Sequence, residues 1–199
     1  MTKTTDGERN YVKEFEDIFT SKIKREGAAE LLAYLKGTDF FEAPASTRFH
    51  GNFKGGLVAH CVKVYNRFLK MVELEWGAGF VTENEESLAV IALLHDVCKI
   101  NCYKVEMRNV KVSGEWVQKP YYAFEDCLPY GHGEKSVYMI SGFMKLTREE
   151  AMAINWHMGA FDVRAREGST LNKAFAQFPL ALIFHLSDMA TSYLDEVVV

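Results

Sequence analysis

The chain has 199 residues, of which 48% are hydrophobic and 25% charged, and its formal net charge is −4. This length and apolar content suit one domain with a full core and exclude global disorder. The negative charge argues against a broad basic surface for duplex nucleic acid, and no apolar run reaches the roughly 20 residues of a membrane-spanning helix. The N-terminal residues contain no apolar signal-peptide core, so we expect a cytoplasmic protein.

Two amphipathic helices are predicted near the N-terminus. Apolar residues recur at helical spacing over 11–19 and 28–35, and Gly37 ends the second segment. We expect residues 1–40 to form a helical extension packed on a main domain that covers 41–199.

A loop rich in small residues follows over 38–54. It carries three groups that can contact an anion, namely Arg48, His50 and Lys54. The pattern allows two interpretations, a solvated connection or a wall that faces a phosphate group.

The next helix is predicted to open at Gly55-Gly56 and to run to about Glu75, before glycines at 77 and 79. His60 lies on its apolar side. A histidine in that position is either a core residue with its hydrogen bonds satisfied or a ligand.

The most apolar stretch of the chain is SLAVIALLHDVCK, residues 87–99. Residues 88–94 are apolar on every side of a helix, which predicts a buried helix. His95 and Asp96 stand at the end of this run. A buried carboxylate is costly unless it is paired or binds a metal, and imidazole and carboxylate both suit a divalent ion. The alternative is an Asp96 that forms a cap or ion pair and a His95 that bonds a backbone carbonyl.

Residues 103–126 have a strand-like composition, unlike the helical patterns on either side. β-Branched and aromatic residues flank Ser113-Gly114, which predicts a β-hairpin with a short turn. The insertion is either functional or a lid over the core. Every other segment has a helical or loop pattern, so the predicted fold class is all-α with this hairpin as an insertion.

Three more helices are predicted towards the C-terminus. One covers about 134–145, the next begins after the capping box at Thr147, and the last runs from Pro179 to about Glu196. A polar loop is expected over 159–172. The four cysteines form no paired CxxC motif, which favours reduced, buried thiols.

Six potential metal ligands lie on or next to predicted helices, most of them beside apolar residues. They are His60, His95, Asp96, His132, His157 and Asp188. Helical domains build metal sites from inward side chains of facing helices. Their wide spacing does not fit a zinc finger, and a set of His and Asp without thiolates suits a hydrolytic or redox-active divalent ion.

The order His60, His95-Asp96, Asp188 resembles the H…HD…D signature of the HD-domain superfamily of metal-dependent phosphohydrolases. The local contexts GGLVAH, LLHDVCK and HLSD are similar as well. The resemblance covers roughly residues 45–195. It implies a single HD-domain helical bundle in which these four residues hold one metal ion.

The resemblance also implies a second ion, because members with two metals add histidines where His132 and His157 stand, with Asp96 bridging. The pattern looks most like the HD domains of bacterial 3′-to-5′ exoribonucleases and cyclic-dinucleotide phosphodiesterases. The chain departs from them in lacking the HDIG variant and a separate oligonucleotide-binding domain, so polymeric RNA is not the expected substrate.

We therefore predict a phosphohydrolase that acts on a nucleotide or other small phosphorylated substrate through water activated by one or two divalent ions (Mn, Fe, Mg, Ni or Zn). Asp96 and Lys99 are the expected catalytic residues, and Lys99 either binds the phosphoryl group or pairs with Asp96. Arg48, His50 and Lys54 are expected to contact the substrate.

Two other functions fit the same residues. One is a non-catalytic HD module that binds a nucleotide or partner for sensing, and the other is a di-iron oxygenase. The aromatic hairpin is a candidate interface of a homo-oligomer.

Overall fold

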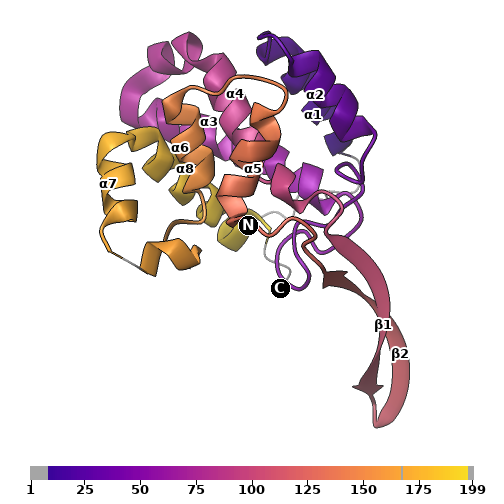
Figure 1. The fold of residues 1–199 in the computed structure, drawn as a ribbon. Coiled ribbons are helices and arrows are strands. Elements are labelled where there is room, and N and C mark those ends of the chain that lie inside the picture. Colours follow the sequence, from indigo (N-terminus) through magenta and orange to yellow (C-terminus); the bar gives the residue numbers. More distant parts are fainter. Residues whose placement is uncertain (1–8, 167, 197–199) are drawn as a thin grey trace.

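The computed structural model describes residues 9–166 and 168–196, and this part of the chain is mostly helical with one two-stranded sheet (Figure 1). The helices are α1 (Tyr11–Lys22), α2 (Ala28–Lys36), α3 (Gly56–Glu83), α4 (Glu85–Leu94), α5 (His132–Ser141), α6 (Arg148–Asn155), α7 (Thr170–Gln177) and α8 (Pro179–Ala190). The strands are β1 (Tyr103–Val112) and β2 (Glu115–Phe124). Short helical turns cover Val97–Lys99, Gly159–Phe161, Val163–Arg166 and Thr191–Asp195. The expected helical domain with a hairpin insertion is confirmed.

Helix α4 forms the centre of the core. Each residue from 88 to 94 is fully buried, and α4 packs against α1, α3 and α6. Its first turn carries Glu85 and Glu86, where negative charge stabilises the positive end of the helix dipole. The apolar sequence of α4 is thus explained by neighbours on all its sides.

The two N-terminal helices share this core. Phe15 of α1 and Leu31 of α2 belong to the same hydrophobic cluster as α4. Gly27, with φ +84°, begins α2 against the backbone of Phe143, where any Cβ would overlap the carbonyl oxygen. The division of the chain into 1–40 and 41–199 remains a prediction, and residues 1–8, 167 and 197–199 lie outside the described part.

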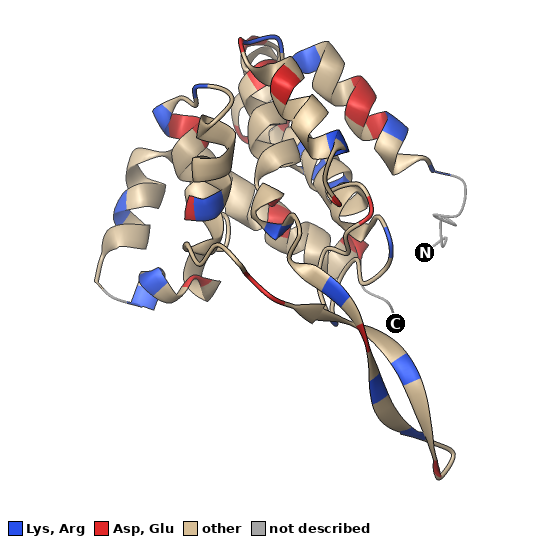
Figure 2. Ribbon diagram, turned by 45° about the vertical axis from the view of Figure 1, so that its right-hand side comes forward, with Lys and Arg blue, Asp and Glu red and all other residues tan. Residues whose placement is uncertain are grey.

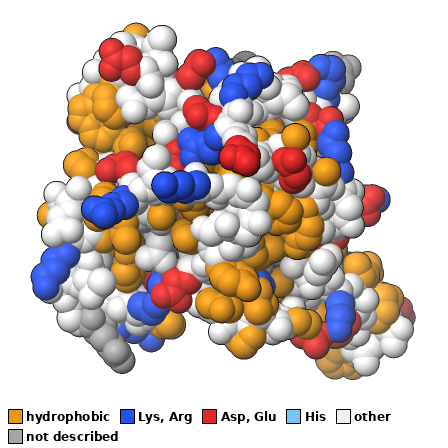
Figure 3. Space-filling view, turned by 45° about the horizontal axis from the view of Figure 1, so that its top comes forward, with side chains coloured by type: hydrophobic (Ala, Val, Ile, Leu, Met, Phe, Trp, Pro, Cys, Tyr) orange, Lys and Arg blue, Asp and Glu red, His pale blue; other side chains and the backbone are white. Residues whose placement is uncertain are grey.

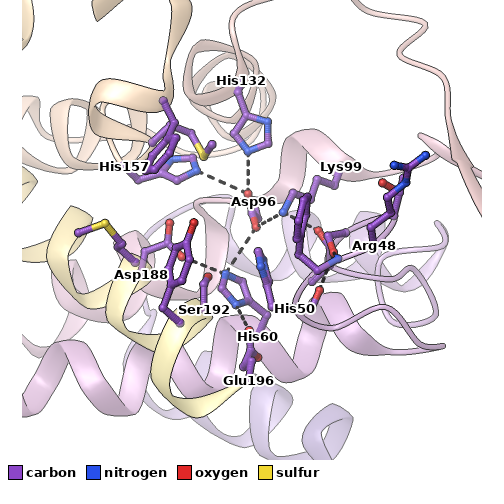
Figure 4. Close-up of a pocket in the computed structure, with 18 of the residues that line it drawn as sticks. Arg48, His50, His60, Asp96, Lys99, His132, His157, Asp188, Ser192 and Glu196 are labelled. Carbon is purple, nitrogen blue, oxygen red and sulfur yellow. Dashed lines mark hydrogen bonds and ion pairs between the residues drawn. The ribbon is translucent and has the colours of Figure 1, made fainter. Parts of the chain in front are cut away.

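Helix α4 ends at Leu94, directly before His95 and Asp96. The hydroxyl of Ser136 on α5 donates to the carbonyl of His95 and accepts a hydrogen bond from the Cys98 amide at 3.2 Å. One side chain thereby satisfies two backbone groups at the helix end. The backbone of Asp96 is no longer α-helical (φ −107°, ψ 15°), and its side chain lies among histidines and Lys99 (Figure 4).

Two boundaries differ from the prediction. Helix α3 was expected to end near Glu75 but extends to Glu83. Gly77 (φ 83°, ψ 166°) forms a local kink, and the backbone is helical again after it. The segment 159–172, expected as a loop, contains two short turns and the start of α7.

The hairpin is confirmed and projects away from the helical body (Figure 1). Its strands pair antiparallel from Tyr103 opposite Phe124 to Val112 opposite Glu115. Positive φ angles at Ser113 (52°) and Gly114 (94°) are those of a type I′ turn, which matches the twist of the strands.

The charged residues are spread over the surface. Basic and acidic residues occur both along the hairpin and on the helical body (Figure 2). On the face seen in Figure 3, acidic and basic side chains alternate with apolar ones. None of the helices in the described residues combines the length and apolar character that crossing a lipid bilayer requires.

Candidate metal centre

A cavity of about 1020 Å³ opens where α4 ends (Figure 4). Its walls come from the loop at 45–50, the start of α3, the base of the hairpin, the start of α5 and the end of α8. Segments far apart in sequence therefore meet here, next to the buried core.

Asp96 is the centre of the site, with only 2% of its side chain exposed. Its carboxylate oxygens lie 2.7 Å from Lys99 Nζ, 2.9 Å from His132 Nε2, 3.4 Å from His95 Nε2, 3.6 Å from His157 Nε2 and 3.8 Å from His60 Nε2. Burial by itself would raise the pKa of Asp96, but Lys99 and the surrounding histidines hold it well below its usual range. Asp96 is thus an ionised carboxylate surrounded by nitrogen atoms.

Two of these histidines have a buried nitrogen that lacks a partner. His95 donates from Nδ1 to the carbonyl of Ala92 at 2.9 Å, and His157 does the same to Ile154 at 2.7 Å. In its neutral form, each ring then keeps a lone pair on Nε2. Neither Nε2 atom has a hydrogen-bond partner among the described residues. Buried polar atoms are otherwise nearly always paired, so these two lone pairs fit a metal ion.

His60 lies between two carboxylates. Its Nε2 is 3.1 Å from Asp188 Oδ1, and its Nδ1 is 2.8 Å from Glu196 Oε2. Burial disfavours the charged ring, but these two hydrogen bonds outweigh burial and raise the pKa of His60 to about 10. The local excess of negative charge requires a cation, either a proton on His60 or a metal ion beside it.

The structure brings all six predicted metal ligands together. Their ligand atoms fall into overlapping groups whose members lie within 4.8 Å of one another: His60, His95 and Asp96; His95, His157 and Asp188; and Asp96 and His132 with Cys98. This donor set of imidazoles and carboxylates suits a divalent ion of the Mn, Fe, Ni or Zn type. Cys98 was not expected here, and burial raises the pKa of its thiol to about 12, which keeps it protonated.

Of the three residues predicted to contact the substrate, two line the cavity and one does not. Arg48 and His50 line the cavity, and the His50 ring lies 4.8 Å from that of His60. Burial and the neighbouring His60 lower the pKa of His50 to about 4, so it is neutral. Lys54 does not join them, because its ammonium pairs with Glu42 at 3.2 Å and it lines a separate, shallow hollow. The expected contact of Lys54 with the substrate stays a prediction.

Lys99 is held from two sides. Its ammonium donates to Asp96 at 2.7 Å and to the carbonyl of Ala45 at 2.8 Å, and the Tyr103 hydroxyl donates to the same carbonyl at 3.2 Å. Of the two roles considered for Lys99, the geometry shows the pairing with Asp96. These bonds also attach the loop at 45–50 to the base of β1.

The sequence reasoning missed Glu196 as a member of the site. Asp188, Ser192 and Glu196 all line the cavity and are spaced by four residues. That spacing places polar groups on one face of a helix, and it is the signal that would have identified Glu196.

Aromatic rings surround the opening of the cavity. The exposed fractions are 78% for Phe49, 51% for Phe124, 61% for Phe161 and 64% for Tyr193, and all four residues line the cavity. Exposed apolar groups at the edge of a pocket are typical of ligand sites.

Comparison with known proteins finds one relevant partial similarity. No family model matches the chain, and no solved structure matches it. A segment of 63 residues is 36% identical to the dihydroneopterin 2′,3′-cyclic phosphate phosphodiesterase of Methanocaldococcus jannaschii. This segment is 32% of the present chain and 25% of the relative, so the chain matches about a quarter of that protein's length.

Proposed function

We propose that this protein is a metal-dependent phosphohydrolase of the HD type that acts on a small phosphorylated substrate, such as a nucleotide. The observation that carries the proposal is the pair of buried, unpartnered Nε2 atoms of His95 and His157 next to the ionised Asp96. The partial similarity to a phosphodiesterase supports the same class of reaction.

The residues that would hold one ion are His60, His95, Asp96 and Asp188. A second ion would use His132 and His157 and share Asp96, whose two oxygens face different histidines. A bound divalent ion lowers the pKa of water and neutralises charge on phosphate oxygens, which is the chemistry that phosphoester hydrolysis needs.

The protein's own groups prepare the site for an anion. Lys99 fixes Asp96 and keeps it ionised, and the carbonyl of Ala45 fixes Lys99 in turn. Arg48 lies at the opening, where its guanidinium can bind a phosphate group through paired hydrogen bonds. The aromatic rings at the edge offer flat apolar faces to a planar heterocycle, which favours nucleotides within this substrate class.

The test combines metal analysis with a panel of phosphorylated compounds. Purified protein is analysed for bound metals and assayed with nucleoside monophosphates, 2′,3′-cyclic nucleotides and a simple aryl phosphodiester. We expect at least one bound divalent ion and turnover that falls by at least about a hundredfold in Asp96→Asn. The matched control is Asp17→Asn, which removes an exposed carboxylate that pairs with Lys13 on the surface of α1.

Three results would contradict the proposal. They are wild-type protein without affinity for divalent ions, turnover unchanged in Asp96→Asn, and tight nucleotide binding without product under every metal. The last result would instead identify the non-catalytic module.

A further inference from the structure

Glu196 is a buried carboxylate that the hydrolytic mechanism leaves without a role. Only 3% of its side chain is exposed, and it approaches His60 from the side opposite to Asp96 and Asp188 (Figure 4). The imidazole of His60 therefore contacts a carboxylate at each of its nitrogens.

The two nitrogens of His60 face different surroundings. Nε2 faces Asp188 and Asp96, at 3.1 and 3.8 Å, inside the group of potential metal ligands. Nδ1 faces the carboxylate of Glu196 at 2.8 Å, and these two residues form a separate possible ligand group with His50. A metal ion on the Nε2 side would take the place of a proton on that nitrogen, and the Glu196 carboxylate would retain the remaining proton at Nδ1. The lone pair of His60 is then on Nε2 and points towards the other potential metal ligands.

The backbone holds Glu196 in this position. Thr191–Asp195 forms a π-helical turn after α8, and the amide of Glu196 donates to the carbonyl of Thr191 at 3.2 Å. Arg67 on α3 binds both carboxylate oxygens of Asp195, at 2.8 and 2.6 Å. This pair fastens the turn to the same helix that carries His60. Single π-helical turns are frequent at functional sites.

We propose that Glu196 is a positioning residue that fixes the tautomer and orientation of His60 and thereby strengthens metal binding. The inference rests on the proposed function only in requiring that the site binds a metal. Carboxylates that accept the second N–H of a ligating histidine contribute tenfold to a hundredfold to metal affinity in other proteins.

The experiment measures the affinity of the full chain for Mn²⁺ and Zn²⁺ by competition with a chelator. Glu196→Ala should bind each ion about 10- to 100-fold more weakly than the wild type. Glu196→Gln should recover most of the loss, because its amide oxygen can accept the same hydrogen bond from Nδ1. Glu85→Ala, which removes a carboxylate from an exposed pair with Lys22, should leave the affinity unchanged.

A spectroscopic measurement separates positioning from a general effect on folding. In the metal-loaded wild type, ¹⁵N spectra of the histidine rings should show His60 protonated at Nδ1, and Glu196→Gln should retain this signal. The inference is overturned by Glu196→Ala with wild-type affinity, by Glu196→Gln as weak as the alanine variant, or by His60 protonated at Nε2. Absence of metal binding by the wild type would instead overturn the proposed function as well.

Discussion

The rings of His95 and His157 meet edge to face, with centroids 4.9 Å apart, and both direct an Nε2 atom without a partner in the described structure towards Asp96. Each buried acceptor that lacks a hydrogen bond costs about 1–3 kcal/mol. The protein retains two of them at one point, which is explained if a cation occupies that point.

Metal ions should therefore stabilise the fold. At a free ion concentration of about 100 times Kd, the free energy of unfolding should rise by about 2.7 kcal/mol. For a chain of this size, the melting temperature should then rise by roughly 5–10 °C. Thermal unfolding of chelator-treated protein, with and without Mn²⁺ or Zn²⁺, measures the gain.

His157→Gln should lose most of this gain, whereas Asp17→Asn should keep it. A melting temperature that does not respond to any divalent ion would contradict the assignment of the site.

Gly159 lies where α6 leads into the site, and its substitution should damage the site specifically. Its φ angle is +53°, and a Cβ there would overlap the imidazole of His185, which donates to the carbonyl of His157 at 2.6 Å. Gly159→Ala should lower the free energy of unfolding by about 1–3 kcal/mol through strain and overlap. It should also weaken metal binding, because His185 must move away from His157.

Gly168 provides the matched control. Its φ angle is +80°, but nothing lies within 4 Å of a Cβ at this position. Gly168→Ala should show only the cost of strain and normal metal affinity, as measured by denaturant titration and chelator competition. Equal effects of the two substitutions would mean that His185 does not support the site.

Arg48 and Lys54 belong to one loop and should differ in their effect on the substrate. Arg48 lines the cavity, whereas Lys54 pairs with Glu42 outside it. Arg48→Gln should raise KM about tenfold, which corresponds to about 1.4 kcal/mol, with a smaller change in kcat.

Lys54→Gln should leave both constants within about twofold of the wild type. Steady-state kinetics with the best compound of the panel checks both variants. A larger effect of Lys54→Gln would restore it to the substrate-binding residues.

The stability of the fold should depend on pH through Glu150. This carboxylate is fully buried and accepts hydrogen bonds from Arg25 at 2.8 Å and from Ser87 at 2.6 Å. Burial by itself would raise the pKa of Glu150, but these bonds and one from the backbone of Thr147 lower it. Because the pKa of Glu150 is lower in the folded than in the unfolded state, its ionised form stabilises the fold at pH values above the unfolded pKa, about 4.3. This stabilisation is lost as the pH falls through the folded-state pKa.

Arg25→Gln leaves this buried carboxylate without its cation. The loss of stability should be about 3 kcal/mol at pH 7, and it should shrink towards pH 4 as Glu150 becomes protonated. Lys22→Gln, in an exposed ion pair with Glu85, should cost less than about 1 kcal/mol. Urea titrations at pH 7 and pH 4 measure the free energy of unfolding of both variants. A loss of stability in Arg25→Gln that is larger at pH 4 than at pH 7 would contradict the predicted pH dependence.

Several local elements could be predicted from the sequence, because their signals are contained in a few neighbouring residues. The apolar run 88–94 predicted a buried helix, Ser113-Gly114 predicted the hairpin turn, and Thr147 with Glu150 predicted the capping box that the structure contains. The potential metal ligands could also be identified by residue type, because Asp and His beside buried apolar residues require hydrogen-bond partners or a metal ion.

The local sequence does not show which of these groups meet in the folded chain. Ser136, far along the chain, bonds the end of α4 where Asp96 leaves the helix. Glu196 reaches His60 because a π-helical turn is fastened to α3, and Lys54 pairs with Glu42 outside the cavity. These outcomes depend on contacts between residues distant in sequence. Hydrophobic periodicity records only which face of a helix is buried, and it does not record which partner that face will meet.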